Sequence, residues 1–302
     1  MIKVRAGRPY ARDTSWERLG RRRFEDVKEL LRRRELFCVP ACARFLRPGR
    51  FSGQVWGSGR ANGSANGKAD GSIGALIFHT KGSLFPILAH HDTDRFSMPP
   101  PLLRFLKKTN IYAVQGLRND VLTLQRIMGE VGKQSTEAID YDLMVLNREP
   151  SAETLRAGPP EISIREPEPG ELEDILPLQS AYEQEEVLPQ GAVFNVAVCR
   201  VNLKRILKEE KVLVAELGGQ IIAKVNTSAI SFTRTQIGGV FVHPSCRGLG
   251  IARRICAELT RTLVNTGRGV NLYVKKWNQS ARLVYQSIGF RSIADYRITY
   301  YR

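Results

Sequence analysis

The apolar positions in the second half of the chain follow two spacings, which predict an alternating series of helices and strands. Residues 250–266 place Ile251, Ile255 and Leu259 on one stripe, as an amphipathic helix does. Residues 211–230 are two apolar runs joined by a pair of glycines, which is typical of a tight hairpin. The pattern predicts helices at 171–187, 197–210, 250–266 and 279–288, and strands at 211–217, 220–230, 235–243, 270–274 and 296–301.

The first half shows a similar order of elements. Its pattern predicts helices at 24–33, 102–108 and 120–129, and strands near 54 and at 74–79, 84–90, 110–114 and 141–146. The strands 84–90 and 240–243 occupy equivalent places in the two series. We therefore interpret the chain as a duplicated α/β fold, with mixed α+β sheets, in which only the second half carries a working pocket.

Two segments lack this patterning. Residues 147–171 contain five prolines and few large apolar side chains, which is typical of a linker, with one short strand at 162–165. Residues 57–72 are rich in Gly, Asn and Ser and predict a hairpin tip. We expect a degenerate, basic α/β domain at 1–150, a linker at 151–160 and a second α/β domain at 161–302.

Composition narrows the class of protein. The 302 residues are 42% hydrophobic, enough to fill cores, which argues against wholesale disorder. The best candidate for a membrane span, residues 36–46, is far shorter than the ~20 apolar residues that a span needs. The first 16 residues lack the apolar middle of a signal peptide. We expect a cytoplasmic protein with no membrane partner.

The formal net charge of +16 lies mostly in the first 150 residues, with its densest clusters at 21–23 and 32–34. A basic face can bind nucleic acid or anionic lipid. No aromatic residues are interleaved with these arginines, as a base-stacking platform would require. The pattern favours a solvated helix face, and a nucleic-acid partner stays open as the alternative.

The cysteines and histidines predict no metal site. The five cysteines form no CxxC pair, so we expect reduced and mostly buried thiols, with Cys246 reachable beside a glycine-rich stretch. Residues 90–94, "HHDTD", have no further ligand at a suitable spacing.

The stretch 240–254, "VFVHPSCRGLGIARR", places two glycines and arginines where a predicted strand meets a predicted helix. The first N–H groups of a helix have no partner within it, and its macrodipole favours an anion there. Gly248 and Gly250 allow close approach to the main chain, and Arg247 and Arg253 can add charge-assisted contacts. A tight turn also needs glycine, so turn chemistry is the alternative.

This stretch resembles the coenzyme A loop of the GNAT acyltransferase superfamily, Arg/Gln-x-x-Gly-x-Gly/Ala, through Arg247, Gly250 and Ala252. A second block, "NQSARLVYQSIGF" at 278–290, is similar to the family's Asn-x-x-Ala-x-x-x-Tyr-x-x-x-Gly-Phe segment. The resemblance covers about 162–302. It implies a GNAT fold for the second half and a degenerate GNAT-like fold for the first, and it is closest to uncharacterised bacterial predicted acetyltransferases.

The resemblance also implies roles for residues. Val240, Phe241 and Val242 would line the pantetheine arm, with a backbone N–H near Val242 polarising the thioester carbonyl. The cradle for the pyrophosphate would consist of Arg247, Gly248, Leu249, Gly250, Ile251, Ala252 and Arg253.

Two further residues match the second block. Asn278 would contact the coenzyme, and Tyr285 would protonate the leaving thiolate. Each has a structural alternative, because Tyr285 shares a helix face with apolar residues and Asn278 begins a helix, where it can act as the N-cap. His243, which follows the strand, is interpreted as structural or solvated rather than as a base.

The acceptor side is less specific. Glu183, Glu185 and Glu186 fall in the helical region that borders the acceptor site in this superfamily, and a carboxylate there could bind or deprotonate an amine. Asn226 and Thr227 could also face the acceptor. For any one of the glutamates, a solvated helix face is the alternative interpretation.

The predicted function is therefore an acyl-CoA-dependent N-acyltransferase, with acetyl-CoA as donor, no metal and an unidentified amine as acceptor. A non-catalytic acyl-CoA sensor, or an acetyltransferase whose basic first half recruits RNA or protein, are the alternatives.

Overall fold

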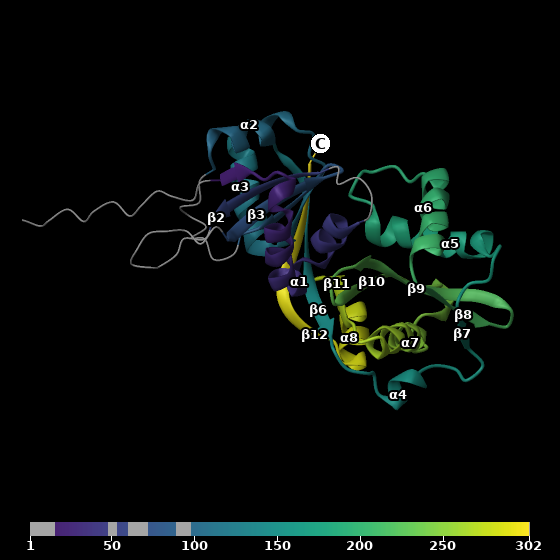
Figure 1. Cartoon of the computed structure of the whole chain (residues 1–302). Coiled ribbons are helices and arrows are strands. Elements are labelled where there is room, and N and C mark those ends of the chain that lie inside the picture. Colours follow the sequence, from purple (N-terminus) through teal and green to yellow (C-terminus); the bar gives the residue numbers. More distant parts are fainter. Residues whose placement is uncertain (1–15, 48–52, 60–71, 89–97, 302) are drawn as a thin grey trace, which may run out of the picture.

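A computed structural model describes residues 16–47, 53–59, 72–88 and 98–301 (Figure 1). Most of the predicted hairpin tip at 57–72 and all of residues 90–94 lie outside these ranges. The α-helices are α1 (Phe24–Leu46), α2 (Pro100–Lys108), α3 (Arg118–Glu130), α4 (Ala152–Leu155), α5 (Leu172–Tyr182), α6 (Val196–Glu209), α7 (Ile251–Asn265) and α8 (Gln279–Ile288). The strands are β1 (Trp16–Arg18), β2 (Gln54–Gly59), β3 (Ile73–Thr80), β4 (Ser83–Ile87), β5 (Ala113–Leu117), β6 (Ser135–Leu146), β7 (Ser163–Arg165), β8 (Val212–Leu217), β9 (Gln220–Ile230), β10 (Arg234–Val242), β11 (Gly269–Lys275) and β12 (Arg291–Tyr301).

All described strands join one 12-stranded mixed sheet, in the order β1-β2-β3-β4-β5-β12-β6-β11-β10-β9-β8-β7. The last strand of the chain, β12, lies between β5 and β6, whereas β6 pairs with β11. Figure 1 shows β12 and β6 side by side where the two halves meet. Each half therefore supplies the strand that completes the other half's part of the sheet.

The two halves repeat one order of elements. Strands β2, β3, β4 and β5 correspond to β8, β9, β10 and β11, and the last two strands of each set are parallel. A helix provides each parallel crossover, α2 in the first half and α7 in the second. The strands predicted to be equivalent, 84–90 and 240–243, contribute to β4 and β10 at the same place in this repeat.

Each parallel pair separates soon after it begins. β4 and β5 are in register only at Ser83–Ala113 and Leu84–Val114. β10 and β11 are in register from Arg234–Gly269 to Gln236–Asn271 and no further. The fold therefore opens twice between parallel strands, once in each half, and a cavity lies at each opening.

Helix α1 joins the two halves through a buried carboxylate. Glu35 is 5% exposed and accepts hydrogen bonds from the Ser231 hydroxyl, from the Thr233 hydroxyl and N–H, and from the Arg234 N–H. Burial raises the pKa of Glu35, but these hydrogen bonds outweigh it and hold the pKa below its usual value. The first helix is thus anchored on the hairpin between β9 and β10.

The structure corrects five predicted boundaries. The strand predicted at 141–146 is β6, which begins at Ser135, and the strand predicted at 296–301 is β12, which begins at Arg291. The helix predicted at 24–33 extends to Leu46, because the chain accommodates Pro40 with a kink at Cys38 (φ −140°, ψ 34°). The strand predicted at 110–114 is β5, which begins three residues later. The helix predicted at 171–187 is α-helical only to Tyr182 and continues as a short π-helix over Glu183–Val187.

Candidate functional site

The glycine-rich stretch lies at the N-terminus of α7, as predicted. A 3-10 turn at Pro244–Cys246 follows β10, and Gly250 is the N-cap of α7 with a left-handed φ of 80°. A glycine N-cap has no side chain to accept hydrogen bonds from the first turn, so that turn keeps unpaired N–H donors. The apolar stripe of α7, including Ile251, Ile255 and Leu259, is buried against the sheet.

The two glycines of this loop do different things. A Cβ on Gly250 would come within 3.0 Å of the Gly158 backbone nitrogen, so Gly250 permits close packing between two loops. Gly248 also has a φ of 80°, but an added Cβ would meet no heavy atom within 4 Å. Gly250 is therefore needed for packing, whereas Gly248 leaves the outer side of the loop open.

The segment predicted as a linker at 151–160 takes part in this packing. α4 contacts α7, and Arg254 Nη1 donates to the Pro159 carbonyl at 3.1 Å. Arg253 Nη2 lies 3.4 Å from Glu153. The connection between the halves thus packs against the helix that begins at the glycine loop.

A cavity of about 600 Å³ opens between β10 and β11 and reaches the glycine loop. Its volume falls in the range of small-molecule sites. The predicted residues that line it are Glu185, Glu186, Val240, Phe241, Val242, Arg247, Gly248, Gly250, Ile251, Ala252, Arg253, Asn278 and Tyr285. Four predicted residues do not line it. Leu249 is half-exposed outside it, and Asn226 is buried in contacts with its own strand. Glu183 accepts a hydrogen bond from Gln179 at 2.9 Å, and Thr227 also lies outside the cavity wall.

The edge of β10 turns main-chain groups toward this cavity. His243 N–H donates to Ile222 of β9, so strand alternation directs the N–H and C=O of Val242 to the opposite edge, toward β11. Arg247 Nε donates to the Val242 carbonyl at 3.2 Å. The pairing with β9 is irregular between Gly238 and Phe241, and Gly239 there has a φ of 61°. This β-bulge lies in the cavity wall.

Helix α8 contributes two of the predicted residues. Asn278 is its N-cap, with Oδ1 accepting from Ala281 N–H at 3.0 Å, while Nδ2 donates to Glu186 at 3.1 Å. The capping role and the place in the cavity wall therefore coexist. Tyr285 is 8% exposed, and burial raises the pKa of its phenol well above the usual value. The phenol consequently keeps its proton at neutral pH.

Two of the three glutamates predicted for the acceptor contact cations in the same cavity wall. Arg247 Nη2 lies 3.0 Å from Glu185, and Lys275 Nζ lies 3.1 Å from Glu186. Both carboxylates come from the π-helix that follows α5. The ion pair between Arg247 and Glu185 therefore joins a residue predicted for the donor to a residue predicted for the acceptor.

Lys224 is a residue that the sequence analysis missed. It is 1% exposed on β9, and its Nζ donates to the Gly239 carbonyl at 2.7 Å and to Asn226 Oδ1 at 3.1 Å. The Tyr182 ring lies 5.2 Å from Nζ. Burial lowers the pKa of Lys224 to about 7, against the opposing effect of Glu183. A lysine inside the apolar run "IIAKV" is the signal that could have revealed it.

The other candidates lie elsewhere. His243 Nδ1 is 2.7 Å from the Ser245 hydroxyl and does not line the cavity. Thr227 donates to Glu210 at 2.8 Å. Among the described residues, no group of His, Cys, Asp and Glu could hold a metal ion. All five cysteines are free, and only Cys246 is not buried.

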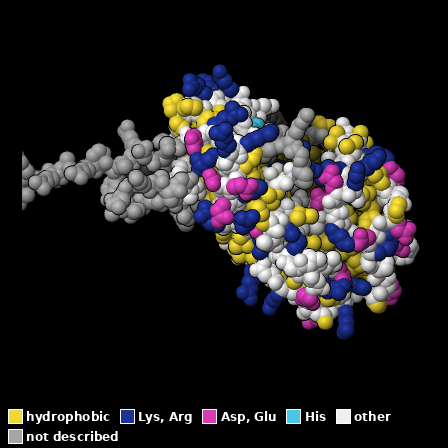
Figure 2. Space-filling view, viewed as in Figure 1, with side chains coloured by type: hydrophobic (Ala, Val, Ile, Leu, Met, Phe, Trp, Pro, Cys, Tyr) yellow, Lys and Arg dark blue, Asp and Glu magenta, His cyan; other side chains and the backbone are white. Residues whose placement is uncertain are grey.

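The basic surface of the first half contains many ion pairs. On and near α1, Arg23 pairs with Glu17 and Asp26, and Arg32 pairs with Glu29. Figure 2 shows basic side chains gathered over α2, where Arg104, Lys107 and Lys108 are exposed, and acidic side chains mixed with basic ones below them. In the part of the chain that the structure describes, no helix is long and apolar enough to cross a membrane.

Comparisons with known proteins agree with this architecture. Residues 176–290 match the model of the Acetyltransferase (GNAT) family. A solved Drosophila protein has a TM-score of 0.60 at 13% identity and covers 95% of this chain and 99% of its own. A GCN5-related N-acetyltransferase from Sphaerobacter thermophilus has a TM-score of 0.56 at 17% identity, with 94% of each chain covered. A tandem GNAT protein from the clavulanic acid biosynthesis pathway has a TM-score of 0.55 at 13% identity and covers 95% of this chain and 98% of its own. The TM-scores and coverages show a shared fold along nearly the whole chain, and at these low identities they show the fold alone. No curated protein matches the sequence.

Proposed function

Because residues 176–290 match the model of the Acetyltransferase (GNAT) family, we propose that the protein transfers an acyl group from an acyl-coenzyme A, with acetyl-CoA as the donor, to an amine. The observation that carries this proposal is the glycine loop at the start of α7, which opens on the cavity between the separated strands β10 and β11. The place and chemistry of this loop suit a diphosphate.

The residues around the loop have the chemistry that such a donor needs. The first-turn N–H groups of α7 and the open side of Gly248 would accept the pyrophosphate, with Arg247 and Arg253 adding charge-assisted contacts. The unpaired edge of β10 would pair with the amides of the pantetheine arm. Asn278 would contact the coenzyme from the start of α8.

The proposed reaction is a direct transfer. The amine nitrogen attacks the thioester carbonyl, a C–N bond forms, and the C–S bond breaks with its electron pair on sulfur. The Val242 N–H polarises the carbonyl, and Tyr285 gives its proton to the thiolate. The proton that the amine loses passes to water or to Glu185 or Glu186, which border the cavity. Lys224 is a positioning residue, since it holds the carbonyl of Gly239 in the bulge.

We propose that the chain consists of two duplicated α/β domains, 1–150 and 161–302, joined by a linker at 151–160. Only the second domain contains a donor site. The helix equivalent to α7 is α2, which begins with Pro100 and Pro101 after Pro99. Proline has no N–H to offer a phosphate. One donor molecule per chain is therefore expected.

The test is calorimetric titration of acetyl-CoA into the wild type and two matched glycine variants. Gly248→Ala and Gly267→Ala place Ala at nearly the same φ (80° and 77°) with nothing within 4 Å of either Cβ. Each carries a similar backbone strain of about 1–2 kcal/mol, but only Gly248 lines the cavity. We expect the wild type to bind one acetyl-CoA per chain. Gly248→Ala should weaken this affinity by about tenfold or more, because the methyl group and the strain oppose the diphosphate. Gly267→Ala should keep the wild-type affinity.

Absence of binding to the wild type, or equal affinity in both variants, would reject the donor site. Turnover is then followed as release of free thiol from acetyl-CoA with a panel of primary amines. Saturable binding without turnover on any amine would instead support an acyl-CoA sensor.

A further inference from the structure

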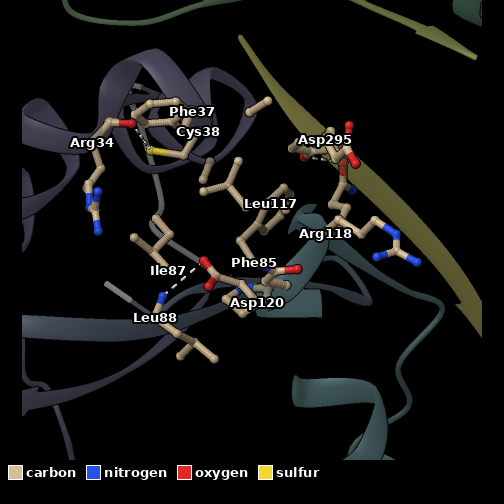
Figure 3. A pocket seen from close by; sticks show the side chains of 17 residues that line it. Arg34, Phe37, Cys38, Phe85, Ile87, Leu88, Leu117, Arg118, Asp120 and Asp295 are labelled. Atoms are coloured by element: carbon tan, nitrogen blue, oxygen red, sulfur yellow. Dashed lines mark hydrogen bonds between the residues drawn. The ribbon is translucent and has the colours of Figure 1, made fainter. Parts of the chain in front are cut away.

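The opening between β4 and β5 in the first half contains a cavity of about 530 Å³ (Figure 3). Its walls come from α1, from β4 and the residue after it, from β5 with the start of α3, and from β12. It occupies the place in the first half that the glycine-loop cavity occupies in the second. Its volume suits a small molecule.

Four charged side chains of the described residues line this cavity: Arg34, Arg118, Asp120 and Asp295. Two of them have partners from outside it. Arg118 lies 3.4 Å from Asp140, and Asp295 lies 2.6 Å from Lys276. Arg34 and Asp120 form no ion pair with any described residue. One cation and one anion of the cavity wall are thus left without a counterion among the described residues.

The two unpaired charges lie on different walls. Figure 3 shows Arg34 on α1 and Asp120 at the start of α3, with apolar side chains between and around them. One Asp120 oxygen accepts the Leu88 N–H at 3.1 Å, which fixes the carboxylate and leaves its other oxygen for a further donor. Burial raises the pKa of Asp120 to about 6, although Arg34 acts against this. A cation supplied by a ligand would offset that burial.

The remainder of the wall is mostly apolar, with Gln115, Asn119 and Tyr296 as its polar residues. The apolar residues of the wall include Phe37, Phe85, Ile87, Leu88 and Leu117. Figure 3 shows Ile87 between the two charged groups. A molecule held here would therefore combine two opposite charges with a hydrocarbon or aromatic body. Free α-amino acids with apolar side chains have this combination.

We propose that the cavity of the first half binds an apolar α-amino acid as its zwitterion, with the ammonium on Asp120, the carboxylate on Arg34 and the side chain among the apolar residues. This binding site is separate from the acyl-CoA site and does not depend on it. A planar guanidinium binds a carboxylate through two parallel hydrogen bonds. The carboxylate of Asp120 in the wall makes the same cavity unsuitable for a diphosphate.

The test is a titration of the full chain with L-phenylalanine and with probes that each lack one feature. N-acetyl-L-phenylalanine has no ammonium, phenethylamine has no carboxylate, and glycine has no side chain. We expect saturable binding of L-phenylalanine, and affinities weaker by about tenfold or more for each of the other three, since each loses one contact of this strength.

Two variants with matched controls assign the contacts. Asp120→Asn and Arg34→Gln should each weaken L-phenylalanine by about tenfold or more. Glu130→Gln on α3 and Arg33→Gln on α1, which change exposed residues outside the cavity, should leave it unchanged. In Asp120→Asn the new amide group would keep an oxygen for the Leu88 N–H, so this variant preserves that hydrogen bond.

Several outcomes would overturn the proposal. No saturable binding of L-phenylalanine or L-leucine by the wild type would reject the site, and this arm needs no variant to fold. Phenethylamine that binds as tightly as L-phenylalanine would show a cation site instead. Binding that survives in both Asp120→Asn and Arg34→Gln would place the amino acid elsewhere. Because acetyl-CoA is absent from these titrations, their result is independent of the donor test.

Discussion

The two cavities of this protein lie at equivalent strand separations but differ in what surrounds them. In the second half, a glycine-capped helix, α7, begins at the cavity and offers N–H donors. In the first half, the equivalent helix α2 begins with prolines, and the cavity wall instead contains Asp120. The difference teaches that the separated parallel strands supply only a space. The residues at the start of the next helices decide what the space can bind.

One ionisable group beside each cavity shows the same contrast between the halves. Lys224 supports the bulge beside the second cavity, and burial lowers its pKa to about 7. Asp120 lines the first cavity, and burial raises its pKa to about 6. In both cases burial disfavours the charged form. Because one group is a base and the other an acid, their effects on stability should have opposite dependence on pH.

The largest expected effect concerns Tyr285 on α8. The tyrosine in the wall of the first cavity, Tyr296, comes from β12 instead. Tyr285→Phe removes the proposed acid while keeping the buried ring, so turnover should fall by about 10²–10⁴-fold, the usual contribution of general acid catalysis. Acetyl-CoA affinity should not change. The measurement is the rate of thiol release on the amine with the highest turnover in the panel, beside a calorimetric titration.

Tyr301→Phe is the matched control, because Tyr301 is also buried and lies in neither cavity. Turnover should be kept in this variant. Equal rates in Tyr285→Phe and the wild type would leave Tyr285 as a core residue and remove the chemical difference between the halves.

The second prediction concerns Lys224. Above pH 7 the folded protein holds this amine neutral, whereas the unfolded chain keeps it protonated up to about pH 10.5. The unfolded state binds more protons in this window, so Lys224 makes the free energy of unfolding rise with pH by up to about 1.4 kcal/mol per unit. Lys224→Met should lack this rise. Chemical denaturation at pH 7, 8 and 9 measures the slopes.

Cys199 and Tyr182 also lie near Lys224, so the difference between the two proteins, rather than either slope alone, is the readout. Lys208→Met, on the last turn of α6 and exposed, is the control and should have the wild-type slope. Parallel slopes for Lys224→Met and the wild type would contradict a neutral buried lysine.

Much of this contrast could be predicted from the sequence, because it depends on local patterns. The 3.6-residue spacing of α7, the glycines before it and the Asn278 block all act over short distances along the chain. They predict the helices around the glycine loop, and thirteen of the predicted site residues line one cavity. The absence of glycines before α2 was equally visible.

Other features depend on contacts distant in sequence and could not be predicted in this way. The insertion of β12 between β5 and β6 is a choice of strand partner, and no periodicity specifies a partner. The contact of Lys224 with Gly239 depends on a bulge in a neighbouring strand. The ion pair between Glu185 and Arg247 depends on how a π-helix meets a loop 62 residues later. Asp120 was seen only as the start of a helix, because the cavity around it is built by five separate elements.

The smallest expected effect concerns Asp120. It tests whether the free energy of unfolding depends on pH in opposite directions through Asp120 and Lys224. Between about pH 4 and pH 6 the folded protein keeps this carboxyl protonated, while the unfolded chain has already lost the proton. The folded state binds more protons in this window, so Asp120 makes the free energy of unfolding fall as pH rises, which is the reverse of the Lys224 effect. Asp120→Asn should lose this fall, and the window is narrower than that of Lys224, so the change is smaller.

Denaturant titrations at pH 4, 5 and 6 compare Asp120→Asn with Glu130→Gln, which changes an exposed acid on the same helix and should keep the wild-type slope. Arg34, Arg118, Asp295 and Cys38 also line the cavity, and they are present in all three proteins, so they cancel in the comparison. If Asp120→Asn and the wild type lose stability equally between pH 4 and pH 6, the carboxyl is hydrated, and the first cavity has no buried anion to set against the buried lysine of the second.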